Sequence, residues 1–143
     1  CCNHDLAAMF GAASPAAGGG LELVFLNGCR SAELGRAVHA AGVPFVVCWR
    51  SRTADDAARR FSVSFFNAYR YHNDYRRAFQ QAKLEVATLP KKSACRLPKY
   101  ALTDPDAPAA DVAHLPPSRR PSIPAGVPVL LCAGADGGAA EIL

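Results

Sequence analysis

The chain has 143 residues, of which 50% are hydrophobic and 20% are charged, and its formal net charge at pH 7 is +4. This length suffices for one domain with a buried core, and the composition is that of a soluble globular protein. The arginines are scattered among acidic residues, which argues against a nucleic-acid-binding stripe, and no apolar run approaches the roughly 20 residues of a membrane span. We therefore expect neither a nucleic acid nor a membrane as partner.

The first predicted elements are a short helix and a strand. Residues 5–13 favour the end of a helix with Leu6, Met9 and Phe10 on one face, and a loop rich in Pro, Ala and Gly follows. Residues 21–27 form a dense apolar run, which is typical of a strand covered on both faces in an α/β fold.

A helix and a second strand come next. Ser31 is expected to cap a helix over 32–41, and Gly42 is expected to end it. Residues 44–49 then form a second apolar run. So short a strand–helix–strand crossover predicts that the two strands are adjacent and parallel.

Two longer helices are predicted after the second strand. Thr53 is expected to cap a helix over 54–70, and Asp74 is expected to cap another over 75–87. We expect both helices to pack against the sheet.

The remainder of the chain changes character. Residues 90–123 are rich in proline and are expected to be an irregular excursion. Residues 124–134 predict a last strand, which Pro128 places at an edge of the sheet. Residues 135–143 are expected to be a frayed tail.

Six cysteines are spread through the chain without any CxxC spacing. Their spacing favours neither a structural zinc site nor a disulfide framework, so we expect no metal, no cofactor and a reducing, cytoplasmic location. The opening Cys1-Cys2-Asn3 has no methionine and no signal-peptide pattern, so we expect the chain to be a fragment of a longer protein. The cysteines are Cys1, Cys2, Cys29, Cys48, Cys95 and Cys132.

Cys29 is the candidate nucleophile, because Gly28 breaks the first strand and leaves the thiol at its carboxyl end. In open α/β sheets this edge is where ligands bind and chemistry is done. A buried structural thiol is the alternative, because unpaired cysteine is among the most buried residue types. The residues expected to line a substrate pocket beside Cys29 are Asn27, Ser31, Trp49, Arg50 and Asp55.

The order of these segments resembles the C-terminal part of a CHAT domain, a caspase-like branch of the clan CD cysteine peptidases. The resemblance lies in LVFLNGCRS, a helix ending in AAG, VPFVVCW, DDAARRFSVSFFNAY and YRRAFQQAKLEV, and it assigns residues 1–89 to that domain. It implies a caspase-like three-layer α/β sandwich with a mostly parallel sheet flanked by helices. It also implies that tetratricopeptide repeats belong to the parent chain.

In such a fold a cysteine thiolate and a histidine base cleave peptide bonds through an acyl-enzyme. The resemblance places Cys29 at the nucleophile position, with backbone N–H groups of Cys29 and of a neighbouring glycine, Gly28, as oxyanion donors. The family's histidine lies in an upstream His-Gly pair, which this chain lacks, so the dyad is incomplete here. None of the four histidines matches it: His4, His39, His72 and His114.

Three functions remain open at this point. The first is a fragment of a cysteine peptidase that acts on a protein or peptide substrate in its full-length form. The second is a non-catalytic CHAT-like scaffold that binds protein partners. The third, a Rossmann-type ligand module, is disfavoured because no G-x-G-x-x-G follows either strand.

Overall fold

The computed structural model describes residues 3–53, 55–87, 126–135 and 137–143. The chain divides into two compact units. Unit 1 is built from Cys1–Arg50 and Pro128–Leu143, and unit 2 from Ser51–Val127. The excursion predicted over residues 90–123 lies outside the described residues.

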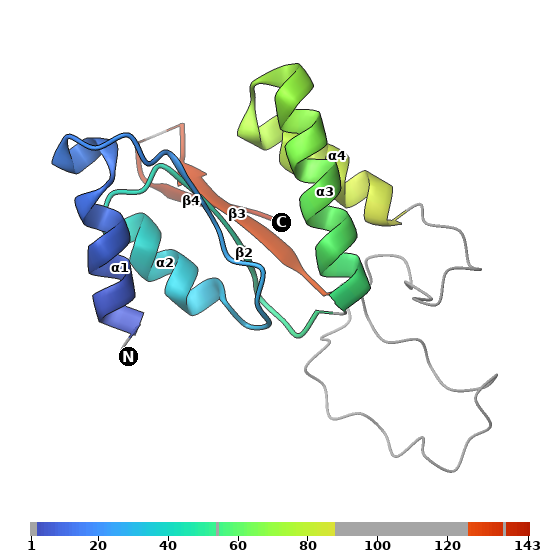
Figure 1. The fold of residues 1–143 in the computed structure, drawn as a ribbon, viewed down its shortest axis with the longest axis horizontal. Helices are drawn as coiled ribbons and strands as arrows, with labels where there is room; N and C mark the ends of the chain where they lie inside the picture. The colour runs from blue at the N-terminus through green and yellow to red at the C-terminus, as the bar shows by residue number, and fades with distance from the viewer. Residues whose placement is uncertain (1–2, 54, 88–125, 136) are drawn as a thin grey trace, which may run out of the picture. The chain divides into compact units, whose positions relative to one another are not determined.

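Unit 1 combines helices with a four-stranded sheet (Figure 1). Both of its α-helices lie against the same face of the sheet, where Ala7 of the first and Val38 of the second join one apolar cluster with Val46 and Leu131 of the strands. Its elements are α1 Asn3–Ala12, η1 Pro15–Ala17, β1 Leu23–Phe25, α2 Ala32–Ala40, β2 Phe45–Trp49, β3 Pro128–Ala133 and β4 Ala139–Ile142.

The sheet is mixed, with the strand order β1-β2-β3-β4. Strands β1 and β2 are adjacent and parallel, as the short crossover predicted. The β2–β3 and β3–β4 pairs are antiparallel, so the expectation of a mostly parallel sheet is wrong. After passing through unit 2, the chain re-enters the sheet at Pro128 beside Trp49, the last residue of β2, so β3 runs in the opposite direction to β2. The chain then turns directly back into β4.

Strand β3 lies inside the described sheet, between β2 and β4, and not at its edge. Pro128 is the first residue of β3, where the missing N–H removes no bond from the middle of the ladder. Residues 139–142, expected to belong to a frayed tail, form β4 and pair with Leu130–Ala133. The sheet is therefore one strand wider than the sequence indicates.

Small residues set the distance between α1 and α2 and the distance between α2 and the sheet. In α1 the buried residues are Ala7 and Gly11, whereas Leu6 and Met9 are 37% and 71% exposed, so the predicted apolar face is wrong at these two positions. In α2 a Cβ on Gly35 would lie 2.8 Å from Cys48 Sγ. Close approach of helix to strand therefore needs glycine at position 35.

Both faces of the central strand β2 are buried, whereas in β1, which was expected to be covered on both faces, only Val24 is buried and Leu23 and Phe25 are half-buried. Val46 and Cys48 belong to the cluster beneath α1 and α2. Val47 and Trp49 alternate with them on the opposite face and are also fully buried.

Unit 2 contains a helical hairpin, formed by α3 Asp55–His72 and α4 Tyr75–Ala87. The two helices pack through buried aromatic side chains, with the Phe61 and Phe79 rings edge to face at 5.6 Å. Asp74 caps α4 as predicted, because its Oδ1 accepts the backbone N–H groups of Arg76 and Arg77 at 2.8 and 3.1 Å.

Candidate functional site

Cys29 lies in the turn between β1 and α2, four residues after Phe25 and three before Ala32. Its side chain is exposed and forms no disulfide, whereas Cys48 and Cys132 are buried. Of the three cysteines that the structure describes, Cys29 is the one that reaches solvent. It sits at the edge where the two parallel strands end and a helix begins.

The Ser31 side chain connects this turn to the sheet. It does not cap α2 by a hydrogen bond, so the side-chain cap that was expected from the sequence is wrong. Its hydroxyl donates to the carbonyl of Leu26 at 3.1 Å and accepts the backbone N–H of Trp49 at 3.0 Å. The hydroxyl therefore joins the end of β1 to the end of β2, two residues after Cys29.

Trp49 and Asn27 make a second link between the same two strand ends. The indole Nε1 donates to Asn27 Oδ1 at 3.2 Å, and the Trp49 side chain is fully buried while Asn27 is exposed. The structure thus brings three of the predicted pocket residues, Asn27, Ser31 and Trp49, together around the turn. Their contacts support the turn.

The backbone of the turn is itself constrained. Arg30 has φ +53°, a left-handed conformation that costs a residue with a Cβ roughly 1 kcal/mol. The bonds of Ser31 on one side and the pairing of Leu26 N–H with the Val47 carbonyl at 2.8 Å on the other hold it in place. The thiol of Cys29 is therefore presented by a turn whose flanks are fixed.

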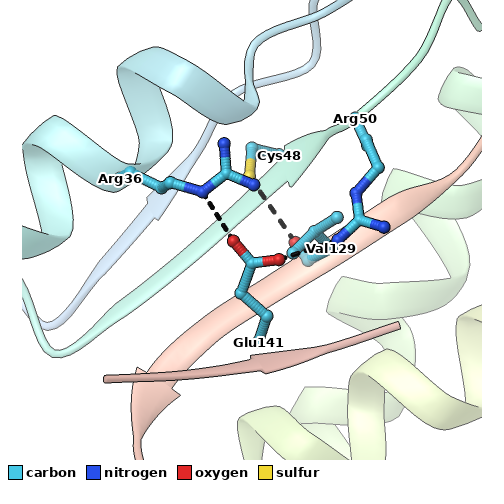
Figure 2. A network of polar contacts seen from close by, with 5 residues as sticks. All are labelled: Arg36, Cys48, Arg50, Val129 and Glu141. Carbon is cyan, nitrogen blue, oxygen red and sulfur yellow. Dashed lines mark hydrogen bonds and ion pairs between the residues drawn. The ribbon is translucent and has the colours of Figure 1, made fainter. Parts of the chain in front are cut away.

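Arg50 follows Trp49, but its guanidinium is directed toward β4 (Figure 2). Its Nη2 lies 2.8 Å from Glu141 Oε2, and Arg36 Nε of α2 lies 2.6 Å from Glu141 Oε1. Because β4 and β1 lie on opposite sides of β2, this contact turns the Arg50 guanidinium away from the strand that precedes Cys29.

Glu141 and Arg36 change each other's proton affinity. The hydrogen bond from Arg36, followed by that from Arg50, lowers the pKa of Glu141. The same bond to Glu141 raises the pKa of Arg36. The two ion pairs connect α2, the end of β2 and β4.

Cys48 lies beside these ion pairs, but its thiol stays protonated and unreactive at neutral pH. Burial raises the pKa of its thiol to about 12, and nearby Arg36 and Arg50 offset only part of that effect. Its Sγ contacts the Val129 carbonyl at 3.8 Å (Figure 2). The thiolate is the reactive form of cysteine, so Cys48 is a core residue and not a second nucleophile.

The described histidines are distributed over three helices. His39 lies in the last turn of α2, about 10 Å along the helix from Ala32, and its Nδ1 is 2.8 Å from the Val43 carbonyl. His4 is in the first turn of α1 and His72 ends α3 in unit 2, while His114 lies outside the described residues. His39, the histidine of unit 1 that follows Cys29 in the sequence, therefore lies at the end of α2 that is farther from Cys29.

The remaining predicted site residue, Asp55, belongs to unit 2, where it is exposed at the start of α3.

Within the part of the chain that the structure describes, no group of His, Cys, Asp and Glu side chains is placed to hold a metal ion. None of the described helices combines the length and the apolar character that crossing a membrane requires.

Two residues that matter to this region were not found from the sequence. Glu141 falls in the segment expected to be a tail, so no pattern pointed to its bridge between two arginines. Gly35 appeared as an ordinary helical position, although its lack of a side chain admits Cys48.

Comparison with known proteins bears on residues 5–126, which match the family model described as CHAT domain. This match includes Cys29, α1 from residue 5 onward and the whole of α2, α3 and α4, and it ends before β3. No curated protein and no solved structure matches the chain.

Proposed function

Because the chain belongs to the CHAT domain family, we propose that Cys29 is the nucleophile of a cysteine peptidase with a caspase-like sandwich fold. One observation carries the proposal. The Cys29 thiol is exposed at the carboxyl end of the parallel strand pair, whereas Cys48 and Cys132 are buried. A nucleophile has to be accessible to its substrate, and among these three cysteines only Cys29 is exposed.

The proposed chemistry is acyl transfer. The Cys29 thiolate attacks the carbonyl carbon of a peptide bond, and the amine leaves with a proton from a histidinium. Water, deprotonated by the same histidine, then hydrolyses the thioester and restores the thiol. Backbone N–H groups of Gly28 and Cys29 would stabilise the oxyanion, and the N-terminus of α2 favours negative charge nearby.

The histidine base belongs, in this proposal, to a strand of the parent protein beside β1, which is the edge strand of the described sheet. The substrate is a protein or peptide, and tetratricopeptide repeats in the parent chain would present it. The location is the reducing cytoplasm, which agrees with three described cysteines outside any disulfide.

A peptidase assay of the parent gene product tests the proposal. Turnover of a peptide library is expected to fall by at least about 1,000-fold in Cys29→Ala, because the covalent route is lost. Cys132→Ala removes a buried thiol and is expected to leave turnover within about threefold of the unsubstituted protein. Turnover that survives Cys29→Ala would rule out the assignment.

A non-catalytic scaffold is the second candidate, and the position of His39 favours it. That histidine lies at the end of α2 farthest from Cys29, where it bonds the Val43 carbonyl. The 143-residue chain itself is therefore expected to show no peptidase turnover. If the parent gene product also shows none while Cys29 remains reactive toward alkylating probes, the scaffold is the better assignment.

A further inference from the structure

A shallow, open groove, called the hairpin groove below, lies along the helical hairpin of unit 2. It consists of two adjoining hollows of about 450 and 480 Å³, which share His72 and Gln81 in their walls. We propose that this hairpin groove binds an acidic segment of a partner protein in an extended conformation. The proposal is independent of Cys29 and its chemistry.

One end of the hairpin groove is basic. His72, Arg76 and Arg77 line the first hollow, and no carboxylate is among its lining residues. The guanidinium groups of Arg76 and Arg77 are on exposed residues, so carboxylates of a partner can approach them.

The other end of the hairpin groove carries an acidic side chain, so the two ends of the groove differ in charge. Glu85 lines the second hollow, and its Oε2 accepts the Ser64 hydroxyl at 2.7 Å. An acidic segment therefore has its carboxylates at the Arg76 and Arg77 end, away from Glu85.

Amide side chains occupy the middle of the groove. Gln80 and Gln81 lie on α4, and Asn67 faces the same groove from α3. Each amide can donate and accept at once, which matches the alternating N–H and C=O groups of an extended peptide. These groups suit a peptide better than a single small anion.

Apolar surface and a rigid frame complete the groove. Tyr71 and Leu84 line it while remaining 83% and 60% exposed, and together they offer contact to an apolar side chain within the acidic segment. The Tyr69 and Tyr75 rings stack at 4.4 Å across the turn between α3 and α4, which helps to hold the two helices of the groove together.

Fluorescence anisotropy with the 143-residue chain tests this proposal. The probe is a fluorescein-labelled octapeptide that contains three glutamates and one leucine, and the matched probe replaces each glutamate by glutamine. We expect the acidic probe to bind at least about tenfold more tightly than the neutral probe, and 300 mM salt to weaken its binding at least about threefold. Equal binding of the two probes would overturn the proposal.

Matched double variants locate the site. Arg76→Gln with Arg77→Gln is expected to weaken binding of the acidic probe at least about tenfold, because both guanidinium groups line the groove. Arg59→Gln with Arg60→Gln removes the same charge from exposed positions of α3 outside the groove and is expected to change affinity less than about twofold. Equal losses in both would indicate non-specific attraction, and preference for an oligonucleotide of equal charge would assign the basic end to nucleic acid. Either result would contradict the proposal.

Discussion

The Ser31 hydroxyl and the backbone N–H of Trp49 are joined by a hydrogen bond of 3.0 Å, across two strands that are parallel neighbours. The bond couples the turn that holds Cys29 to the strand that lies in the middle of the apolar core. A change at Ser31 should therefore be measurable at Trp49, which is the only tryptophan in the sequence and so a natural fluorescent reporter of unit 1.

Ser31→Ala should destabilise unit 1 by about 1–3 kcal/mol, because Leu26 and the buried backbone of Trp49 both lose the hydroxyl as a partner. Urea unfolding followed by Trp49 fluorescence measures the effect. Ser14→Ala is the matched control within unit 1, since the buried Ser14 hydroxyl has no hydrogen-bond partner among the described residues. Its effect should stay within about 0.5 kcal/mol, and an equal loss in both variants would contradict a special role for Ser31.

Gly35→Ala tests the close contact between α2 and β2. Alanine favours a helix by about 1 kcal/mol relative to glycine, but its Cβ would lie 2.8 Å from Cys48 Sγ. We expect the steric cost to dominate and the free energy of unfolding to fall by about 1–3 kcal/mol. In a double-mutant cycle Cys48→Ala should recover part of this loss by removing the sulfur, and a cycle with no coupling would show that the backbone shifts instead.

Glu141→Gln should make stability less sensitive to acid. The pKa of Glu141 is lowered in the folded state, so its stabilisation is fully present above its ordinary value of 4.5 and is lost as the pH falls through the folded value. The partners are substantially exposed, so the expected loss in Glu141→Gln at pH 7 is below about 1 kcal/mol, and it should be smaller at pH 3. Urea unfolding at the two pH values gives the difference, and a constant gap between the proteins would argue against an ionic origin.

The cysteines should differ in reactivity toward a thiol-directed alkylating probe near neutral pH. Cys29 is exposed and should be labelled well before Cys132 and Cys48, which are buried; burial also raises the pKa of Cys48 to about 12. Mass spectrometry of the folded chain, read site by site, keeps Cys1, Cys2 and Cys95 out of the comparison. If Cys29 reacts only on unfolding, the nucleophile assignment loses its physical support.

The parallel strand pair and its helix could be predicted because their signals are local. Dense apolar runs end at Gly28 and Trp49, and Gly42 ends the helix between them with φ +109°, which glycine tolerates without strain. Asp74 was recognisable as a cap for the same reason, because the residues it bonds are two and three positions away.

The missed features depend on partners that are distant in sequence. The segment 139–142 contains two alanines and a glutamate, which have low strand propensity, and becomes β4 only because β3 offers an edge to pair with. Leu6 and Met9 fit a buried face by spacing, but α1 meets α2 through Ala7 and Gly11, since small residues permit the closer approach. The Glu141 bridge likewise exists only once α2, β2 and β4 have assembled.

The pairing of Trp49 with Pro128 has a consequence for the order in which the chain folds. Cys48 and Val129, which meet across the centre of the sheet, are separated by 81 positions. On a ribosome, β1 and β2 therefore emerge long before the strand that pairs with the free side of β2. Closing such a long loop costs entropy before any contact repays it, so we expect formation of the β2–β3 pair to be the slow step, with the α3–α4 hairpin already helical.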